Sequence, residues 1–213
     1  MIKHRAIFYD LDNTLYPQIL DVRQRVSACA QKFFPENSNE VENFWLKEWQ
    51  NNEPKKNLID IICNTFECRF DKEHIIHFYR SYKTNIQLQD EVANLLIKFK
   101  SLGIKQFVIT NGIKEVQEYK IKKLELDKLI DDYAVGEGEY RKPNTYYFIK
   151  FLEKYKLNSF ETFSVGDWYE VDGVASQSAG IEFIYLKGGP IVEEIPKNVR
   201  QIDTLLSLKG LMC

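Results

Sequence analysis

The amino-acid sequence predicts an α/β protein: a doubly wound, Rossmann-like parallel sheet with an inserted all-helical cap domain. Short apolar runs rich in β-branched and aromatic residues predict the strands. They lack a polar–apolar alternation, so both of their faces should be buried. Stretches with apolar residues at helical spacing separate the later runs, as in strand–helix–strand units. One long segment after the first run carries helical patterns alone, which indicates an insertion.

The elements of the sheet unit follow from these patterns. The expected strands are Arg5–Tyr9, Ile104–Thr110, Tyr133–Gly136, Thr162–Val165 and Ile181–Leu186. The expected helices are Glu91–Ser101, Ile113–Leu126, Thr145–Tyr155 and Glu170–Ala179. We expect the tail after Pro190 to add a final helix or two that pack on the sheet.

The insertion is expected to span residues 16–88, and the catalytic core residues 1–15 and 89–213. Four helical patterns fill the insertion: Asp21–Phe34, Glu40–Gln50, Lys55–Phe66 and Lys72–Thr84. Its ten basic and ten acidic residues balance, so it does not have the charge of an arm that binds a polyanion. Its dense aromatic residues are expected to form a small helical core.

The overall composition excludes several classes of protein. The 29 basic and 31 acidic residues give a net charge of -2, which argues against a partner that is a nucleic acid polymer. No apolar run approaches the roughly 20 residues of a membrane-spanning helix. The four cysteines form no C-x-x-C pair, so we expect reduced thiols in a cytoplasmic protein rather than a zinc site or disulfides.

Polar side chains follow three of the expected strands and precede the helix after a fourth. Ligands of open α/β sheets bind beyond the carboxyl ends of the strands, so these residues should converge at one edge of the sheet. They are Asp10, Asp12, Thr110, Asn111, Gly112, Lys142, Asp167 and Asp172.

The chemistry of this set indicates a site for a metal ion and an anion. Four neighbouring aspartates cannot all ionise unaided, and a hard cation such as Mg²⁺, with oxygen ligands and a bound phosphate, resolves the conflict. Lys142 supplies a fixed positive charge. Thr110 offers a hydroxyl, and Asn111 and Gly112 offer donors at a helix start, which suits an anionic oxygen. One carboxylate can attack phosphorus, and a second can act as acid and then as base.

These motifs, in this order, resemble the four motifs of the haloacid dehalogenase superfamily over nearly the whole chain. The resemblance implies that Asp10 is the nucleophile and a metal ligand, and that Asp12 is the acid/base with its backbone carbonyl on Mg²⁺. It implies that Thr110 binds the phosphoryl group and that Lys142 stabilises nucleophile and phosphate. Asp167 would ligate Mg²⁺, and Asp172 would support the metal shell or Lys142.

The same resemblance indicates phosphate chemistry. The dehalogenases of the superfamily lack an aspartate at the position of Asp12, and the insertion resembles the cap of the branch that includes phosphoglycolate phosphatase, β-phosphoglucomutase and several nucleotidases. The segment from Asp12 to Pro17 is similar to pyrimidine 5′-nucleotidase-like members. Tyr16 follows the catalytic loop directly and is expected to face the substrate cleft.

We therefore expect a Mg²⁺-dependent phosphatase, a monomer or homodimer, that acts on a small phosphorylated metabolite such as a nucleoside monophosphate. A sugar phosphate or phosphoglycolate is the next substrate class. Two alternatives remain open: a phosphomutase that reuses the aspartyl-phosphate, and a non-catalytic protein that binds a phosphorylated ligand.

Overall fold

The computed structural model of the chain describes residues 4–51, 58–191 and 194–211. The chain divides into two compact units, Met1–Pro17 with Gln87–Cys213, and Gln18–Ile86. The first is an α/β unit and the second is helical. Compared with the boundaries expected from the sequence, the two residues at either end of the insertion, 16–17 and 87–88, group with the α/β unit.

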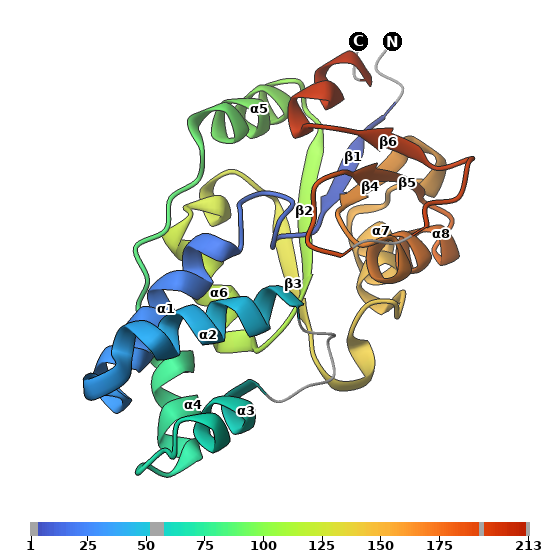
Figure 1. Cartoon of the computed structure of the whole chain (residues 1–213). Helices are drawn as coiled ribbons and strands as arrows, with labels where there is room; N and C mark the ends of the chain where they lie inside the picture. The colour runs from blue at the N-terminus through green and yellow to red at the C-terminus, as the bar shows by residue number, and fades with distance from the viewer. Residues whose placement is uncertain (1–3, 52–57, 192–193, 212–213) are drawn as a thin grey trace. The chain divides into compact units, whose positions relative to one another are not determined.

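The α/β unit is built on a parallel sheet of six strands in the order β3-β2-β1-β4-β5-β6 (Figure 1). The strand order reverses its direction of growth between β1 and β4, so the carboxyl ends of these two neighbours form the switch point of the sheet. The strands are β1 (Ala6–Tyr9), β2 (Lys105–Asn111), β3 (Asp132–Gly136), β4 (Thr162–Gly166), β5 (Glu182–Leu186) and β6 (Arg200–Ile202).

The tail differs from the expected final helix or two. It adds β6 at the edge of the sheet, parallel to β5, and ends in a 3₁₀ helix (η6, Leu205–Leu211). In β6, Arg200 and Gln201 are exposed and Ile202 is buried. Three residues with one buried side chain carry too little pattern to be recognised as a strand.

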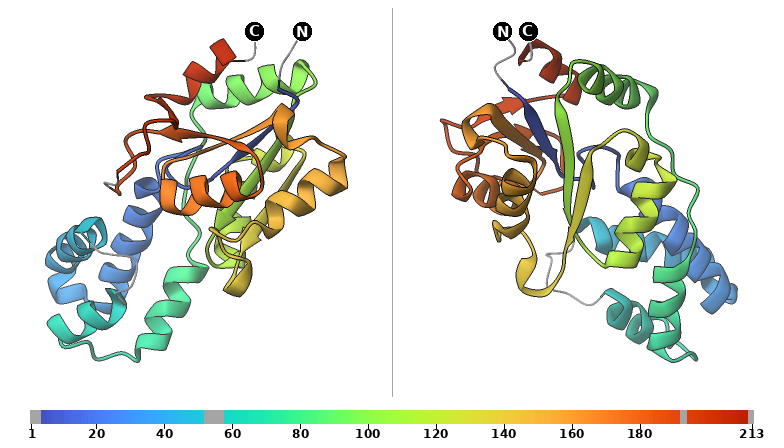
Figure 2. Two further views of the ribbon diagram at one scale, coloured as in Figure 1. Left: turned by 90° about the vertical axis from the view of Figure 1, so that its right-hand side faces the viewer. Right: turned by 180° about the vertical axis from the view of Figure 1, so that it is seen from behind.

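Helices cover both faces of the sheet (Figure 2). One face carries α5 (Asp90–Ser101) and α6 (Lys114–Lys123), and the other carries α7 (Tyr146–Tyr155) and α8 (Val174–Ser178). The predicted helix over 170–179 is instead a π-helical turn (η5, Tyr169–Gly173) followed by the short α8. The predicted helix over 113–126 ends earlier, because Glu125 has a φ of 55° and a 3₁₀ turn (η2, Leu126–Lys128) follows.

Aromatic side chains hold the sheet to α7. Phe8 of β1 is buried, and its ring centroid lies 5.0 Å from that of Phe107 in β2 and 5.2 Å from that of Phe148 in α7. Phe107 in turn lies 5.3 Å from Phe151, one turn further along the helix. Each buried aromatic ring removes a large apolar area from water, so this cluster fixes the strands that end in the site.

The helical unit has its own core. Its helices are α1 (Ile19–Phe33), α2 (Ser38–Asn51), α3 (Leu58–Thr65) and α4 (Lys72–Ser81), with a 3₁₀ turn (η1, Pro35–Asn37) between the first two. Apolar residues from all four helices form one cluster that includes the buried Trp45. The predicted helix over 72–84 ends at Ser81, where Tyr82 turns to extended backbone, and residues 55–57 of the third predicted helix lie outside the described residues.

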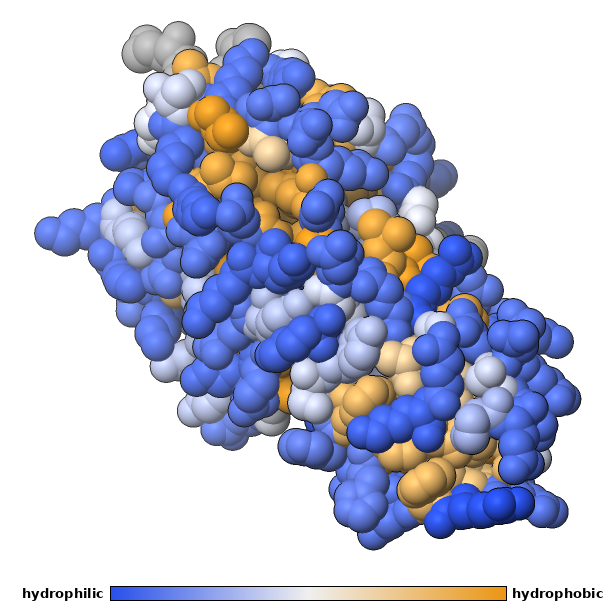
Figure 3. Space-filling view, turned by 90° about the vertical axis from the view of Figure 1, so that its left-hand side faces the viewer, coloured by the Kyte–Doolittle hydropathy of each residue, from blue (hydrophilic) through white to orange (hydrophobic). Residues whose placement is uncertain are grey.

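Most of the surface visible in Figure 3 is hydrophilic, with separate hydrophobic patches. Among the described residues, Phe160, Ile97 and Phe70 are the most exposed large apolar residues, and they are far apart in the sequence. Cys29, Cys63 and Cys68 are free thiols. None of the helices that the structure describes has the length and apolar character needed to cross a membrane.

Candidate active site

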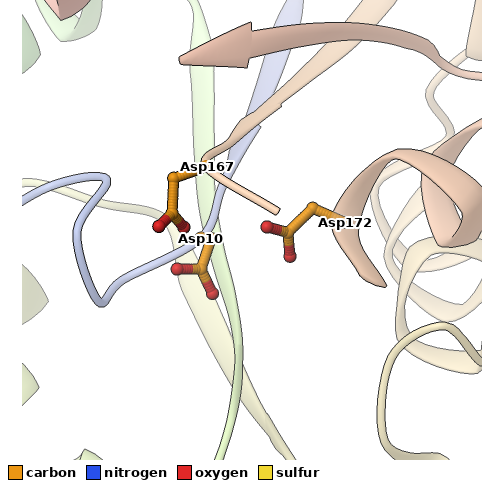
Figure 4. A group of neighbouring side chains, drawn as sticks. All are labelled: Asp10, Asp167 and Asp172. Atoms are coloured by element: carbon orange, nitrogen blue, oxygen red, sulfur yellow. The ribbon is translucent and has the colours of Figure 1, made fainter. Parts of the chain in front are cut away.

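Two carboxylates lie at the switch point of the sheet because β1 and β4 end side by side. Asp10 follows β1, and its backbone N–H donates to the carbonyl of Val165 in β4 at 2.9 Å. Asp167 follows the last residue of β4. Figure 4 shows the side chains of Asp10, Asp167 and Asp172 pointing toward one another.

These three aspartates form a group that could hold a metal ion. Each offers one carboxylate oxygen, and the three oxygens lie within 4.8 Å of one another. Burial raises the pKa of Asp10 to about 7, with help from Asp172 and Asp12 and against the effect of Lys142. Burial and the charges of Asp10 and Asp172 raise the pKa of Asp167 to about 8. Crowded, buried oxygen ligands of this kind fit Mg²⁺, which would relieve their repulsion.

Gly166 lets Asp172 come this close. A Cβ at residue 166 would lie 2.6 Å from Cγ of Asp172, which real Cβ atoms do not tolerate. The π-helical turn after β4 aims the carboxylate back at the strand end, where the N–H of Trp168 donates to it at 3.2 Å. Gly166 is therefore needed for the close approach of Asp172 and not for a left-handed backbone conformation.

Lys142 joins two of the carboxylates. Its buried Nζ lies 2.7 Å from Oδ1 of Asp10 and 2.6 Å from Oδ1 of Asp172, and it donates to the carbonyl of Ile109 at 2.6 Å. Burial alone would lower the pKa of Lys142, but the two aspartates outweigh it and raise that pKa above its usual value. Lys142 therefore stays charged beside the predicted nucleophile.

Asn111 fixes the backbone of Lys142. The amide Nδ2 donates to the carbonyl of Lys142 at 2.9 Å, and its Oδ1 accepts from the N–H of Lys142 at 2.8 Å. Both ends of the amide are thus engaged by protein, although the sequence suggested that Asn111 contacts substrate. Gly112, the other expected substrate donor, continues the same loop with a φ of 153°.

Asp12 lies in a tight loop and receives three donors. Asn13 has a φ of 59°, a left-handed conformation that asparagine tolerates, and it lets the loop fold back so that the Tyr16 hydroxyl donates to Oδ1 of Asp12 at 2.7 Å. Lys120 contacts both carboxylate oxygens, at 2.8 and 3.0 Å, and Nε2 of Gln117 contacts Oδ2 at 3.0 Å. Burial would raise the pKa of Asp12, but Lys120, Gln117 and Tyr16 together lower it.

Thr110 is connected to Asp12 through the same glutamine. Nε2 of Gln117 also donates to Oγ1 of Thr110 at 2.7 Å, and Thr110 is buried at the end of β2. The structure therefore brings Asp10, Asp167, Asp172 and Lys142 together directly. Hydrogen bonds join Tyr16, Asp12 and Thr110 through Gln117, and Asn111 bonds the backbone of Lys142.

Sequence reasoning missed Gln117 and Lys120. Both lie on the buried side of α6, with Ile121 beside them. The available signal was two polar residues three apart, at helical positions that an amphipathic helix would give to its apolar face.

Comparison with known proteins points to one family. The model of the family described as haloacid dehalogenase-like hydrolase matches residues 7–186. Glyceraldehyde 3-phosphate phosphatase of Pyrococcus furiosus is 23% identical over 205 residues, which cover 91% of this chain and 85% of the relative.

Solved structures agree with the fold. A protein from Haemophilus somnus described as a predicted phosphoglycolate phosphatase superposes with a TM-score of 0.73, 23% identity and full coverage of both chains. YfnB of Bacillus subtilis, crystallised bound to magnesium, gives a TM-score of 0.73 at 17% identity over 98% of each chain. At these identities the likeness establishes the fold of this chain.

Proposed function

Because the chain belongs to the haloacid dehalogenase-like hydrolases, we propose that it is a Mg²⁺-dependent phosphatase that hydrolyses a small phosphate monoester through an aspartyl-phosphate on Asp10. One observation carries the proposal: the carboxylate of Asp10 lies at the switch point of the sheet, 2.7 Å from the ammonium of Lys142 and in one cluster with the carboxylates of Asp167 and Asp172. A nucleophile and a fixed positive charge thus meet where a metal ion could bind.

The residues divide the first chemical step among them. An oxygen of Asp10 attacks phosphorus, the new P–O bond forms, and the bond to the leaving oxygen breaks. Asp12 gives its proton to that leaving oxygen. Lys142 stabilises the charge on the transferring group, and Thr110 hydrogen-bonds one of its oxygens.

The second step returns Asp10 to its starting form. Asp12, now a carboxylate, takes a proton from water, and the water oxygen attacks phosphorus, so that the acyl phosphate bond breaks and inorganic phosphate forms. The hydrogen bonds from Tyr16, Gln117 and Lys120 favour this charged form of Asp12.

Asp10, Asp167 and Asp172 are the residues that would hold Mg²⁺, with the backbone carbonyl of Asp12. The ion would supply charge neutralisation for the phosphoryl group. The carboxylates of Asp10, Asp167 and Asp172 lie within 4.8 Å of one another, and Lys142 pairs with two of them. This crowding of carboxylate oxygens supports the assignment of a cation.

Two substrate classes are proposed. A nucleoside monophosphate or related metabolite is the first, from the similarity of residues 12–17 to pyrimidine 5′-nucleotidase-like proteins. A short-chain sugar phosphate is the second, because a relative that aligns with 91% of this chain carries the name glyceraldehyde 3-phosphate phosphatase. The helical unit is proposed to act as the lid that selects the leaving group, and the cytoplasmic location stays a prediction.

Phosphate release from a panel of phosphorylated metabolites tests the proposal. Purified chain should release phosphate with Mg²⁺ and not with EDTA, and Asp10→Asn should abolish release, whereas the exposed Asp127→Asn serves as a control that keeps it. Release that survives EDTA or Asp10→Asn contradicts the mechanism. Transfer of phosphate between two sugar positions would identify a phosphomutase, and binding without turnover a phosphate-binding protein.

A further inference from the structure

We propose that Lys120 and Gln117 are positioning residues that fix the orientation of the Asp12 carboxylate for its acid and base steps. The inference rests on the proposed phosphatase function and deepens it. It starts from the convergence of α6 side chains on Asp12, a residue more than 100 positions earlier in the chain.

Lys120 contacts the Asp12 carboxylate in a way that restricts its orientation. Its side chain is 4% exposed, so its charge needs a partner inside the protein. Nζ lies 2.8 Å from one carboxylate oxygen of Asp12 and 3.0 Å from the other. The ammonium also lies 5.8 Å from the centroid of the Tyr16 ring, whose hydroxyl holds the same carboxylate. Contact with both oxygens fixes the plane of the carboxylate as well as its position.

Gln117 connects the Asp12 carboxylate to Thr110 at the end of β2, which is proposed to bind phosphate. Its Nε2 lies 3.0 Å from Oδ2 of Asp12, 2.7 Å from Oγ1 of Thr110 and 3.2 Å from the carbonyl of Asn111. Gly112 leaves room for this side chain, since a Cβ there would lie 2.8 Å from Cγ of Gln117. One amide thus sets the position of Asp12 relative to Thr110.

A direct contact between Lys120 and the substrate phosphate is the competing explanation. The two ideas differ in what they predict for different leaving groups. A residue that acts through Asp12 matters most where the leaving oxygen needs a proton, as in an alkyl phosphate. A residue that binds phosphate affects an alkyl and an aryl phosphate equally, because both carry the same phosphoryl group.

The test compares kcat/KM of Lys120→Met on glycerol 3-phosphate and on 2,4-dinitrophenyl phosphate, which needs no proton on its leaving group. General acid catalysis contributes about 10²–10⁴-fold, so we expect a loss of at least about 30-fold on the alkyl phosphate and less than about 3-fold on the aryl phosphate. Asp12→Asn should show the same selectivity. The exposed Lys122→Met is the matched control on the same helix and should leave both values unchanged.

A double-variant cycle completes the test. If Lys120 acts through Asp12, the Lys120→Met/Asp12→Asn variant should be no slower than Asp12→Asn alone. Lys120→Arg, which keeps the charge, should recover part of the activity on the alkyl phosphate. Should Lys120→Met fail to fold, Gln117→Leu is expected to give the same selectivity on a smaller scale.

Equal losses on the two substrates, or a double variant whose losses multiply, would overturn the inference. Its failure is separable from that of the phosphatase proposal. An inactive unmodified chain, or an active Asp10→Asn, refutes the proposed function, whereas an active unmodified chain whose Lys120→Met variant lacks leaving-group selectivity refutes only the positioning role.

Discussion

Replacing Arg25 by methionine should destabilise the helical unit by about 3–5 kcal/mol, the range for breaking a buried ion pair by removing one partner. The Arg25 side chain is 1% exposed. Its Nε donates to Oδ2 of Asp21 at 2.7 Å, and its Nη1 donates to the backbone carbonyls of Tyr79 at 2.6 Å and Tyr82 at 2.9 Å. One guanidinium thus ties α1 to the end of α4.

The magnitude follows from what methionine leaves behind. Methionine fills the space of the arginine stem but donates no hydrogen bond, so the carbonyls lose a donor and Asp21 becomes an uncompensated buried charge. Asp21 keeps one strong partner, the Thr84 hydroxyl at 2.6 Å, which is too little to balance a full charge. Neutralising it in an Arg25→Met/Asp21→Asn variant should therefore recover part of the loss.

Tryptophan fluorescence during urea unfolding can follow this unit. Trp45 and Trp49 lie in its core or against it, and Trp168 lies in the other unit. The exposed Arg23→Met is the matched control and should change the unfolding free energy by less than about 0.5 kcal/mol. A loss below about 1 kcal/mol for Arg25→Met, or a double variant less stable than the single one, would refute the reasoning.

Four further predictions concern the site. Asn111→Leu should lower kcat about 100-fold in a phosphate-release assay with little change in Tm, because it frees the backbone that carries Lys142; a uniform loss of folded protein would contradict this. Gly166→Ala should weaken Mg²⁺ binding measured by calorimetry at least about tenfold, since its Cβ overlaps Asp172; unchanged affinity would show that this close approach is dispensable. Apparent Mg²⁺ affinity should rise about tenfold per pH unit between pH 7 and 8, more steeply below pH 7, and level off above pH 8, because protons compete for Asp167 and for Asp10, whose pKa values are about 8 and about 7. Since the pKa of Asp167 is raised above the roughly 3.9 of an unfolded aspartate, the metal-free chain should lose stability between pH 4 and 8, and a flat Tm over this range would contradict the assignment.

The parts of the fold that the sequence predicted are those with a repeating physical signal. The strand Ile104–Thr110 was recognisable because the consecutive apolar residues 107–109 need burial on both faces, and the structure places β2 there. The convergence of Asp10 and Asp167 followed from the rule that parallel strands end at one edge, without knowledge of any contact. Patterns of this kind can be recognised in a sequence because several residues carry the same signal.

The parts that could not be predicted depend on a single side chain's direction. The spacing of Gln117 and Lys120 indicates that both lie on the apolar face of α6, but it does not say that they meet Asp12. The Asn111 amide bonds the backbone of Lys142 at both of its ends, and this depends on the path of the chain between these two residues. Strand β6 depends on pairing with β5, a long-range interaction that three residues do not encode.

The two ends of the helical unit are held together within that unit. The amide of Gln24 in α1 exchanges two hydrogen bonds with the backbone of Asn85, at 2.6 and 3.2 Å, and Asp21 accepts from Thr84. An inserted segment that is fastened to itself near its two ends costs its host no more closure entropy than a short loop does. We therefore expect that a different helical segment joined at the same two points could replace the insertion without disturbing the folding of the α/β unit.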